Sequence, residues 1–135
     1  MINLTKPDVI LLRSVYICSP LRQFELNRTI AEYLKSHGIS VYLPEIHTNQ
    51  SGSPGKIFQS NVEAIRSTTI VVAVLKDYGK DFGFEIGYAY GLGKKIIGYA
   101  EDDHYEADTM IRGALDIVVQ TIDLLVARIK DLLGR

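Results

Sequence analysis

The chain has 135 residues, of which 47% are hydrophobic and 23% are charged, close to the composition of an ordinary globular domain. This composition excludes a disordered, collagen-like or coiled-coil chain, and the length predicts a single domain over residues 1–135. Because 15 Lys and Arg, scattered along the chain, stand against 16 Asp and Glu, a nucleic-acid polymer or an anionic membrane is not expected as a partner.

The N-terminal region and the single cysteine indicate the cellular compartment in which the protein is expected. Cys18 has no partner for an internal disulfide, and the first residues lack the basic and then apolar run of a signal peptide. We therefore expect a cytoplasmic protein. Residues 1–13 form an N-terminal extension, in which the apolar run 9–12 could pack as an extra edge strand.

Short apolar runs rich in β-branched residues alternate with longer segments of helical period, which is the pattern of a parallel sheet with crossover helices. Residues 14–18 (SVYIC) predict a buried strand, and residues 21–37 predict a helix that Gly38 ends. Residues 39–43 predict a second strand. A loop rich in Ser, Gly and Pro follows over residues 45–55.

The second half of the chain continues this alternation. A helix over residues 56–66 leads into a strand over residues 69–75 (TIVVAVL), which is apolar on both faces and is therefore predicted to be central. Residues 76–83 predict a loop. The remaining predicted elements are a helix over 84–92, a strand over 95–99, an acidic loop over 101–107, a strand over 116–120 and an amphipathic C-terminal helix.

The loops that follow the strands are the expected place for a ligand. In open α/β sheets, ligands bind beyond the carboxyl ends of the strands, where the connections diverge. Candidate functional residues are therefore expected in segments 19–23, 76–85 and 101–108.

Glu85 lies in the run DFGFEIGYAYG, after a glycine-containing loop and in the first turn of the predicted helix. One interpretation is that it only completes the helix start, where the macrodipole favours a carboxylate by up to about 1 kcal/mol. Its apolar neighbours Phe84 and Ile86 predict partial burial, and Asp81 lies four residues upstream. Paired carboxylates in a cleft indicate glycosidic chemistry.

Four ordered segments, VYICSPLR, IFQSNVEAI, IVVAVLKDYGKDFGFEIGYAYGLGKKIIGY and MIRGALD, resemble the nucleoside 2-deoxyribosyltransferase family over residues 15–133. The most specific block is FEIGYAYGLGKKIIGY. The resemblance implies a flavodoxin-like, doubly wound five-stranded parallel sheet of order 2-1-3-4-5 with helices on both faces. It also implies cleavage of the N-glycosidic bond of 2'-deoxynucleosides through a covalent deoxyribosyl-glutamate.

The resemblance assigns roles to residues near the first and third predicted strands. Glu85 matches the family's nucleophile, and Tyr16 matches a tyrosine that orients it, whereas the sequence alone favours a core tyrosine. Asp81 matches, across a gap, an aspartate that contacts the nucleobase; the alternative is a helix N-cap. Gly83 lies in this shortened loop and is included among the substrate-binding residues.

Three further positions bear on the substrate. Asn61 falls where many members have an aspartate that helps to protonate the departing base, and an amide can only orient the base by hydrogen bonds. Arg22 falls where a sister branch, the 2'-deoxynucleoside 5'-monophosphate N-glycosidases, binds the 5'-phosphate; the alternative is an exposed residue at a helix start. Asp108 falls where transferases have an asparagine that reaches a neighbouring subunit, and it would repel a phosphate unless Arg22 or Arg112 pairs with it.

Three functions therefore remain open: deoxyribosyl transfer to another nucleobase or to water, hydrolysis of a 5'-monophosphate, and a non-catalytic nucleotide-binding regulatory module. The expected partners are a nucleoside or nucleotide, a nucleobase and further copies of the chain, because the resemblance implies a homo-oligomer with shared active sites. No cofactor is expected. Cys18 and the three histidines lack metal-ligand spacing, and the glycines of GYAYGLGKK do not form a dinucleotide fingerprint.

Overall fold

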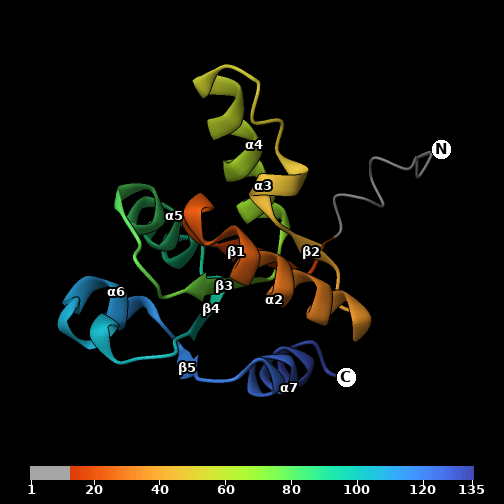
Figure 1. Ribbon diagram of the computed structural model, residues 1–135, viewed down its shortest axis with the longest axis vertical. Coiled ribbons are helices and arrows are strands. Elements are labelled where there is room, and N and C mark those ends of the chain that lie inside the picture. The colour runs from red at the N-terminus through yellow and green to blue at the C-terminus, as the bar shows by residue number, and fades with distance from the viewer. Residues whose placement is uncertain (1–12) are drawn as a thin grey trace.

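The computed structural model describes residues 13–135, so the predicted strand at 9–12 lies outside the described residues. Five parallel strands form one sheet in the order β2-β1-β3-β4-β5 (Figure 1). The strands are β1 (Val15–Cys18), β2 (Val41–Tyr42), β3 (Ile70–Val74), β4 (Lys95–Tyr99) and β5 (Ile117–Val119). This order confirms the flavodoxin-like fold that the sequence predicted.

Helices connect successive strands. They are η1 (Leu21–Gln23), α2 (Phe24–Ser36), α3 (Pro44–His47), α4 (Pro54–Ser67), α5 (Lys80–Gly91), η2 (His104–Ala107), α6 (Thr109–Ala114) and α7 (Ile122–Leu132). No helix within residues 13–135 is long and apolar enough to cross a membrane.

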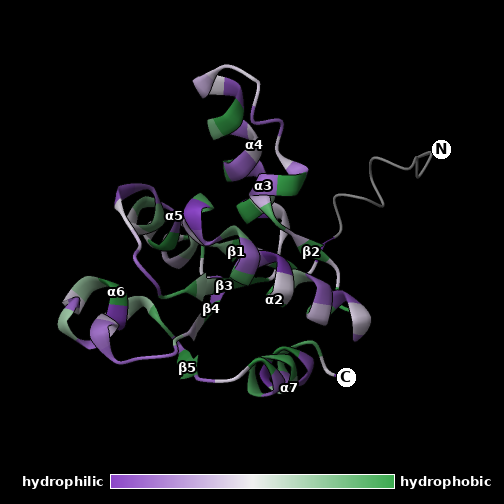
Figure 2. Cartoon of the chain, viewed as in Figure 1, coloured by the Kyte–Doolittle hydropathy of each residue, from purple (hydrophilic) through white to green (hydrophobic). Residues whose placement is uncertain are grey.

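The sheet separates two apolar clusters. One cluster packs α2 and α7 against the sheet, and the other packs α4, α5 and α6 against the opposite face. Alternation along β1 sends Val15 and Ile17 to the first cluster and Tyr16 and Cys18 to the second. The outer side of α2 carries mostly hydrophilic residues, as expected for a helix with one buried face (Figure 2).

Three predicted loops are wrong in part. The predicted loop over residues 76–83 ends early because α5 already begins at Lys80, and Phe82 in its first turn is buried in the core. Glu85 is consequently the sixth residue of the helix rather than part of its first turn, and Asp81 is inside the helix rather than its N-cap, which is Gly79.

The predicted loop over 45–55 contains the short helix α3. Pro44, which was expected only to end the strand, occupies the first position of this helix, where its fixed φ angle suits a helix start. At the other end of the segment, the Ser53 side chain accepts a hydrogen bond from the backbone N–H of Lys56 and starts α4 at Pro54. The acidic loop likewise contains η2.

Candidate active site

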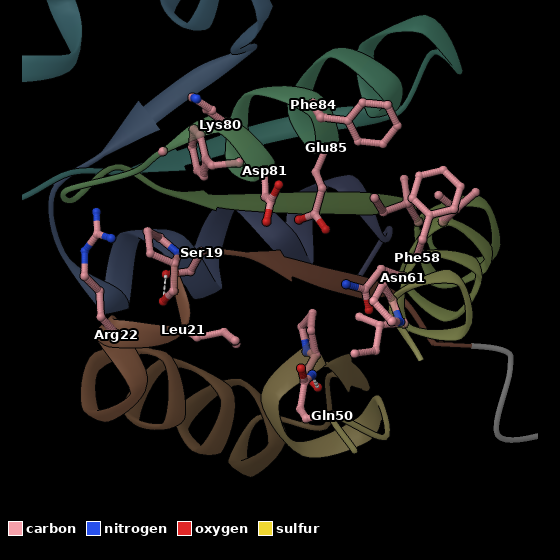
Figure 3. A pocket seen from close by; sticks show the side chains of 18 residues that line it. Ser19, Leu21, Arg22, Gln50, Phe58, Asn61, Lys80, Asp81, Phe84 and Glu85 are labelled. Carbon is pink, nitrogen blue, oxygen red and sulfur yellow. Dashed lines mark hydrogen bonds between the residues drawn. The ribbon is translucent and has the colours of Figure 1, made fainter. Parts of the chain in front are cut away.

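A cleft of about 910 Å³ opens beyond the carboxyl ends of β1 and β3 (Figure 3). It is lined by the segment after β1, by one side of α4, and by the first turns of α5. Four residues singled out in the sequence line it together: Arg22, Asn61, Asp81 and Glu85. The cleft therefore lies where an α/β sheet of this kind binds ligands.

Two donors from β1 hold the carboxylate of Glu85. The Tyr16 hydroxyl donates a hydrogen bond to Oε2 at 2.9 Å, and the Cys18 thiol donates one to Oε1 at 3.2 Å. Both donors are fully buried. Tyr16 and Cys18 are two residues apart in a strand, so both side chains point toward α5, and each carboxylate oxygen receives one of them.

Burial and hydrogen bonding act in opposite directions on Glu85. Burial raises the pKa of its carboxyl above the usual range, and nearby Asp81 adds to this effect. The hydrogen bonds from Cys18 and Tyr16 favour the ionised form and limit the rise in pKa. Burial, followed by the adjacent Glu85 carboxylate, also raises the pKa of the Tyr16 hydroxyl and of the Cys18 thiol, so both groups stay protonated and act as donors.

Asn61 presents its amino group to the cleft. Its Oδ1 accepts a hydrogen bond from the buried Thr48 hydroxyl at 2.7 Å, and Thr48 is hydrogen-bonded to Tyr42 at 2.5 Å. The Tyr42 ring in turn stacks on Tyr16 at 5.7 Å between centroids. Because the hydrogen bond from Thr48 fixes the orientation of the amide, the Nδ2 group is the part of Asn61 that can donate to a ligand.

The two ends of the cleft differ in chemistry. Phe58 and Phe84, whose ring centroids are 5.8 Å apart, lie at the end where α4 and α5 meet. Arg22 lies at the other end, with Asp81 and Glu85 between them (Figure 3). Arg22 is exposed and makes no ion pair within residues 13–135.

Three residues proposed from the sequence do not line this cleft, and one of them is Tyr16, which is fully buried and reaches the site only through its hydrogen bond to Glu85. Gly83 lies on α5 between Phe82 and Phe84, which line the cleft, but does not line it itself. Asp108 precedes α6, and its carboxylate accepts a hydrogen bond from Tyr78 rather than pairing with Arg22 or Arg112. Burial, reinforced by Asp108, raises the pKa of Tyr78 to about 12.

Sequence reasoning missed Cys18 and Thr48. Cys18 was assigned to the core or the surface, although its position two residues after Tyr16 already placed both on one side of a strand. Thr48 lies in a segment that was interpreted only as a loop, and no signal in the sequence connects it to Asn61. Within residues 13–135, no group of three or more His, Cys, Asp or Glu side chains is placed to hold a metal ion.

The fold and the cleft define a flavodoxin-like α/β protein with a half-buried carboxylate on the wall of a cleft at the carboxyl edge of its sheet. The family model described as nucleoside 2-deoxyribosyltransferase matches residues 15–126, and the chain belongs to this family. It is therefore an enzyme that acts on N-glycosyl bonds, in a family whose members act on nucleosides and nucleobases.

Solved structures share the fold at low sequence identity. A 2-deoxyribosyltransferase from Bacillus psychrosaccharolyticus is 20% identical with a TM-score of 0.72, over 84% of this chain and 90% of that one. A CMP N-glycosidase from Clostridium botulinum is 19% identical with a TM-score of 0.60, over 89% of this chain and 99% of that one. A conserved protein from Enterococcus faecalis V583 is 19% identical with a TM-score of 0.69, over 89% of this chain and 98% of that one. No curated protein matches the chain.

Proposed function

We propose that the protein cleaves the N-glycosidic bond of 2'-deoxynucleosides with Glu85 as nucleophile and transfers the 2-deoxyribose to another nucleobase or to water. The observation that carries this proposal is the Glu85 carboxylate, held on the cleft by one hydrogen bond to each oxygen. Such a carboxylate is fixed in orientation, and its raised pKa indicates incomplete solvation, which makes it a better nucleophile than a hydrated one.

The reaction proceeds in two displacements at the anomeric carbon. In the first step, a lone pair of a Glu85 carboxylate oxygen forms a C–O bond to this carbon while the C–N bond breaks. The electron pair of the C–N bond leaves with the base nitrogen, which gains a proton. In the second step a nitrogen of another base, or water, attacks the same carbon and loses its proton, and Glu85 departs as a carboxylate. Two inversions give net retention of configuration.

The aromatic end of the cleft suits the nucleobase. Phe58 and Phe84 offer ring faces for stacking, and the Asn61 amino group can donate to a lone pair on the base. Asn61 cannot supply a proton, so Asp81 or water is assigned the protonation of the departing base. The position of Asp81 supports this role, because it lines the cleft one helical turn before Glu85.

The alternative substrate is a 2'-deoxynucleoside 5'-monophosphate, which the enzyme would hydrolyse. Arg22 favours it, because its exposed guanidinium lies at the end of the cleft opposite the aromatic rings. Comparing kcat/KM for a deoxynucleoside and its 5'-monophosphate distinguishes the two substrates. Arg22→Ala should lower kcat/KM for the monophosphate alone, and Arg128→Ala on α7 is the matched control.

We also propose a homo-oligomer whose sites are completed by the loop bearing Asp108 of a neighbouring copy. Phe84 and Tyr90 on α5 are 51% and 64% exposed, and Phe58 on α4 is 49% exposed. Exposed aromatic side chains on α4 and α5 favour contact with another chain next to the cleft that Phe58 and Phe84 also line.

Incubation with a deoxynucleoside and a foreign base tests the proposed activity. Exchanged nucleoside or free base should appear with the wild type and not with Glu85→Gln. A 2-fluoro-2-deoxynucleoside should leave a sugar adduct on the peptide containing Glu85, because the electronegative substituent slows breakdown of the ester. Saturable binding without turnover would instead favour the non-catalytic module, and an adduct on Asp81 would move the nucleophile.

A further inference from the structure

In the chemistry described so far, the Cys18 thiol only helps to hold Glu85 and has no part in deciding which carboxylate oxygen reacts. Its side chain is fully buried at the end of β1, and its thiol donates to Oε1 of Glu85 at 3.2 Å. The carbonyl of Phe82, at 3.9 Å, lies at the outer limit of its reach. The thiol is therefore directed mainly at the carboxylate.

The two oxygens of Glu85 are held by donors of unequal strength. The Tyr16 hydroxyl is a strong donor to Oε2, whereas a thiol is a weak donor to Oε1. A strong hydrogen bond stabilises the lone pairs of the oxygen that accepts it and makes that oxygen less reactive. Oε1 is therefore the oxygen that is fixed in place and still nucleophilic.

We propose that Cys18 is a positioning residue that aims Oε1 of Glu85 at the anomeric carbon and yields its weak hydrogen bond as the new bond forms. This inference rests on the proposed function. It also separates the two oxygens: Oε1 becomes the ester oxygen, and Oε2 becomes the ester carbonyl.

The change in bonding at the carboxylate explains why a weak donor fits Oε1. When Oε1 bonds to the anomeric carbon, the C–N electron pair leaves with the base and Oε1 loses most of its capacity as an acceptor. Oε2 remains a good acceptor as the ester carbonyl, so the Tyr16 hydrogen bond persists. A strong donor on Oε1 would stabilise the free carboxylate relative to the ester and slow the attack.

The charged and titratable groups near Glu85 come from each wall of the cleft. Tyr16 and Cys18 face it from β1, and Asp81 lies one turn earlier on α5. Arg22 after β1 and Lys80 at the start of α5 line the same cleft, and the α4 wall contributes the neutral Asn61. Of these, Tyr16, Cys18 and Asp81 contribute to the pKa of Glu85, and the thiol hydrogen bond lowers it.

Three substitutions at one position separate donation from packing. Cys18→Val removes the donor and introduces a slightly larger, β-branched side chain that suits a strand, Cys18→Ala removes both donor and volume, and Cys18→Ser replaces the weak donor by a stronger one. Val74→Ala, a buried change on the opposite face of the sheet, is the control for a loss of packing alone.

The readouts are the titration of the Glu85 carboxyl carbon by NMR, assigned with Glu85→Gln, and the pH profile of kcat/KM. In Cys18→Val and Cys18→Ala, the carboxyl titration and the acid limb should both move up by about half to one pH unit, because a hydrogen bond to the ionised form is lost. In Cys18→Ser both should stay at or below their wild-type positions, while kcat falls about three- to tenfold with little change in KM.

The outcomes are distinct. Titration that is unchanged in Cys18→Val and Cys18→Ala would reduce Cys18 to a packing residue and overturn the proposal. A Cys18→Ser variant faster than the wild type would overturn the weak-donor argument. The NMR titration needs no substrate, so a chain that turns over no deoxynucleoside would refute the proposed function, while the titration still decides whether the thiol holds Glu85.

Discussion

Glu85 combines a proposed chemical role with a cost to the folded state. Burial raises its pKa, so the folded chain holds this proton more tightly than the unfolded chain does. Stability is therefore lost as the pH rises from the unfolded value through the folded one. Glu85→Gln should lower kcat/KM by at least about 1,000-fold and raise the melting temperature at pH 7, with no gain near pH 3. Melting curves at both pH values and a turnover assay measure this, and a Gln variant that is less stable at pH 7 would contradict it.

Tyr16 acts on the Glu85 carboxylate through one hydrogen bond. Tyr16→Phe keeps the ring that stacks on Tyr42 and removes the donor to Oε2, so it should reduce kcat by about 10- to 100-fold and leave the fold intact. The acid limb of kcat/KM should move to higher pH, because this hydrogen bond lowers the pKa of Glu85. Tyr33→Phe on α2, which loses a hydrogen bond to Asp123 far from the cleft, should leave the acid limb unchanged.

At the scale of elements, one buried amide joins two walls of the cleft. Asn27 on α2 donates to the carbonyl of Pro20 at 3.2 Å and to Glu45 on α3 at 3.0 Å, while Arg28 lies 3.4 Å from the same carboxylate. Asn27→Ala removes one donor from a nearly buried carboxylate and the tie between α2 and the Pro20 carbonyl, which keeps its hydrogen bond from the Gln23 N–H, so it should destabilise the fold by about 1–3 kcal/mol.

Asn27→Ala should also raise KM more than it lowers kcat, since the residues that it holds border the substrate rather than the reacting carbon. Denaturant unfolding and steady-state kinetics measure the two effects. Glu32→Ala, on the exposed side of α2, is the control and should stay within about 0.5 kcal/mol of the wild type. Equal stability of the two variants would show that the Asn27 hydrogen bonds contribute nothing.

At the scale of the whole molecule, the proposed shared site can be tested by mixing two inactive variants. If Glu85 of one copy works with Asp108 of another, subunit exchange between Glu85→Ala and Asp108→Ala oligomers produces mixed assemblies that contain intact sites. Activity should then rise toward about a quarter of the wild-type value in a dimer with random exchange. A chain that sediments only as a monomer at micromolar concentration, or mixtures that stay inactive, would contradict the shared site.

The sequence by itself determined the alternation of strands and helices, because strand and helix periods and turn residues are local properties, and the resemblance supplied the sheet order. The resemblance also pointed to Glu85 and Tyr16, whose catalytic roles stay proposals and whose side chains are hydrogen-bonded at 2.9 Å. Only the tertiary structure decided where α5 begins, since the burial of Phe82 depends on the sheet beneath it. It alone placed the Cys18 thiol on a carboxylate 67 residues away and Thr48 on Asn61, because such contacts arise from packing between elements rather than from any periodicity within one.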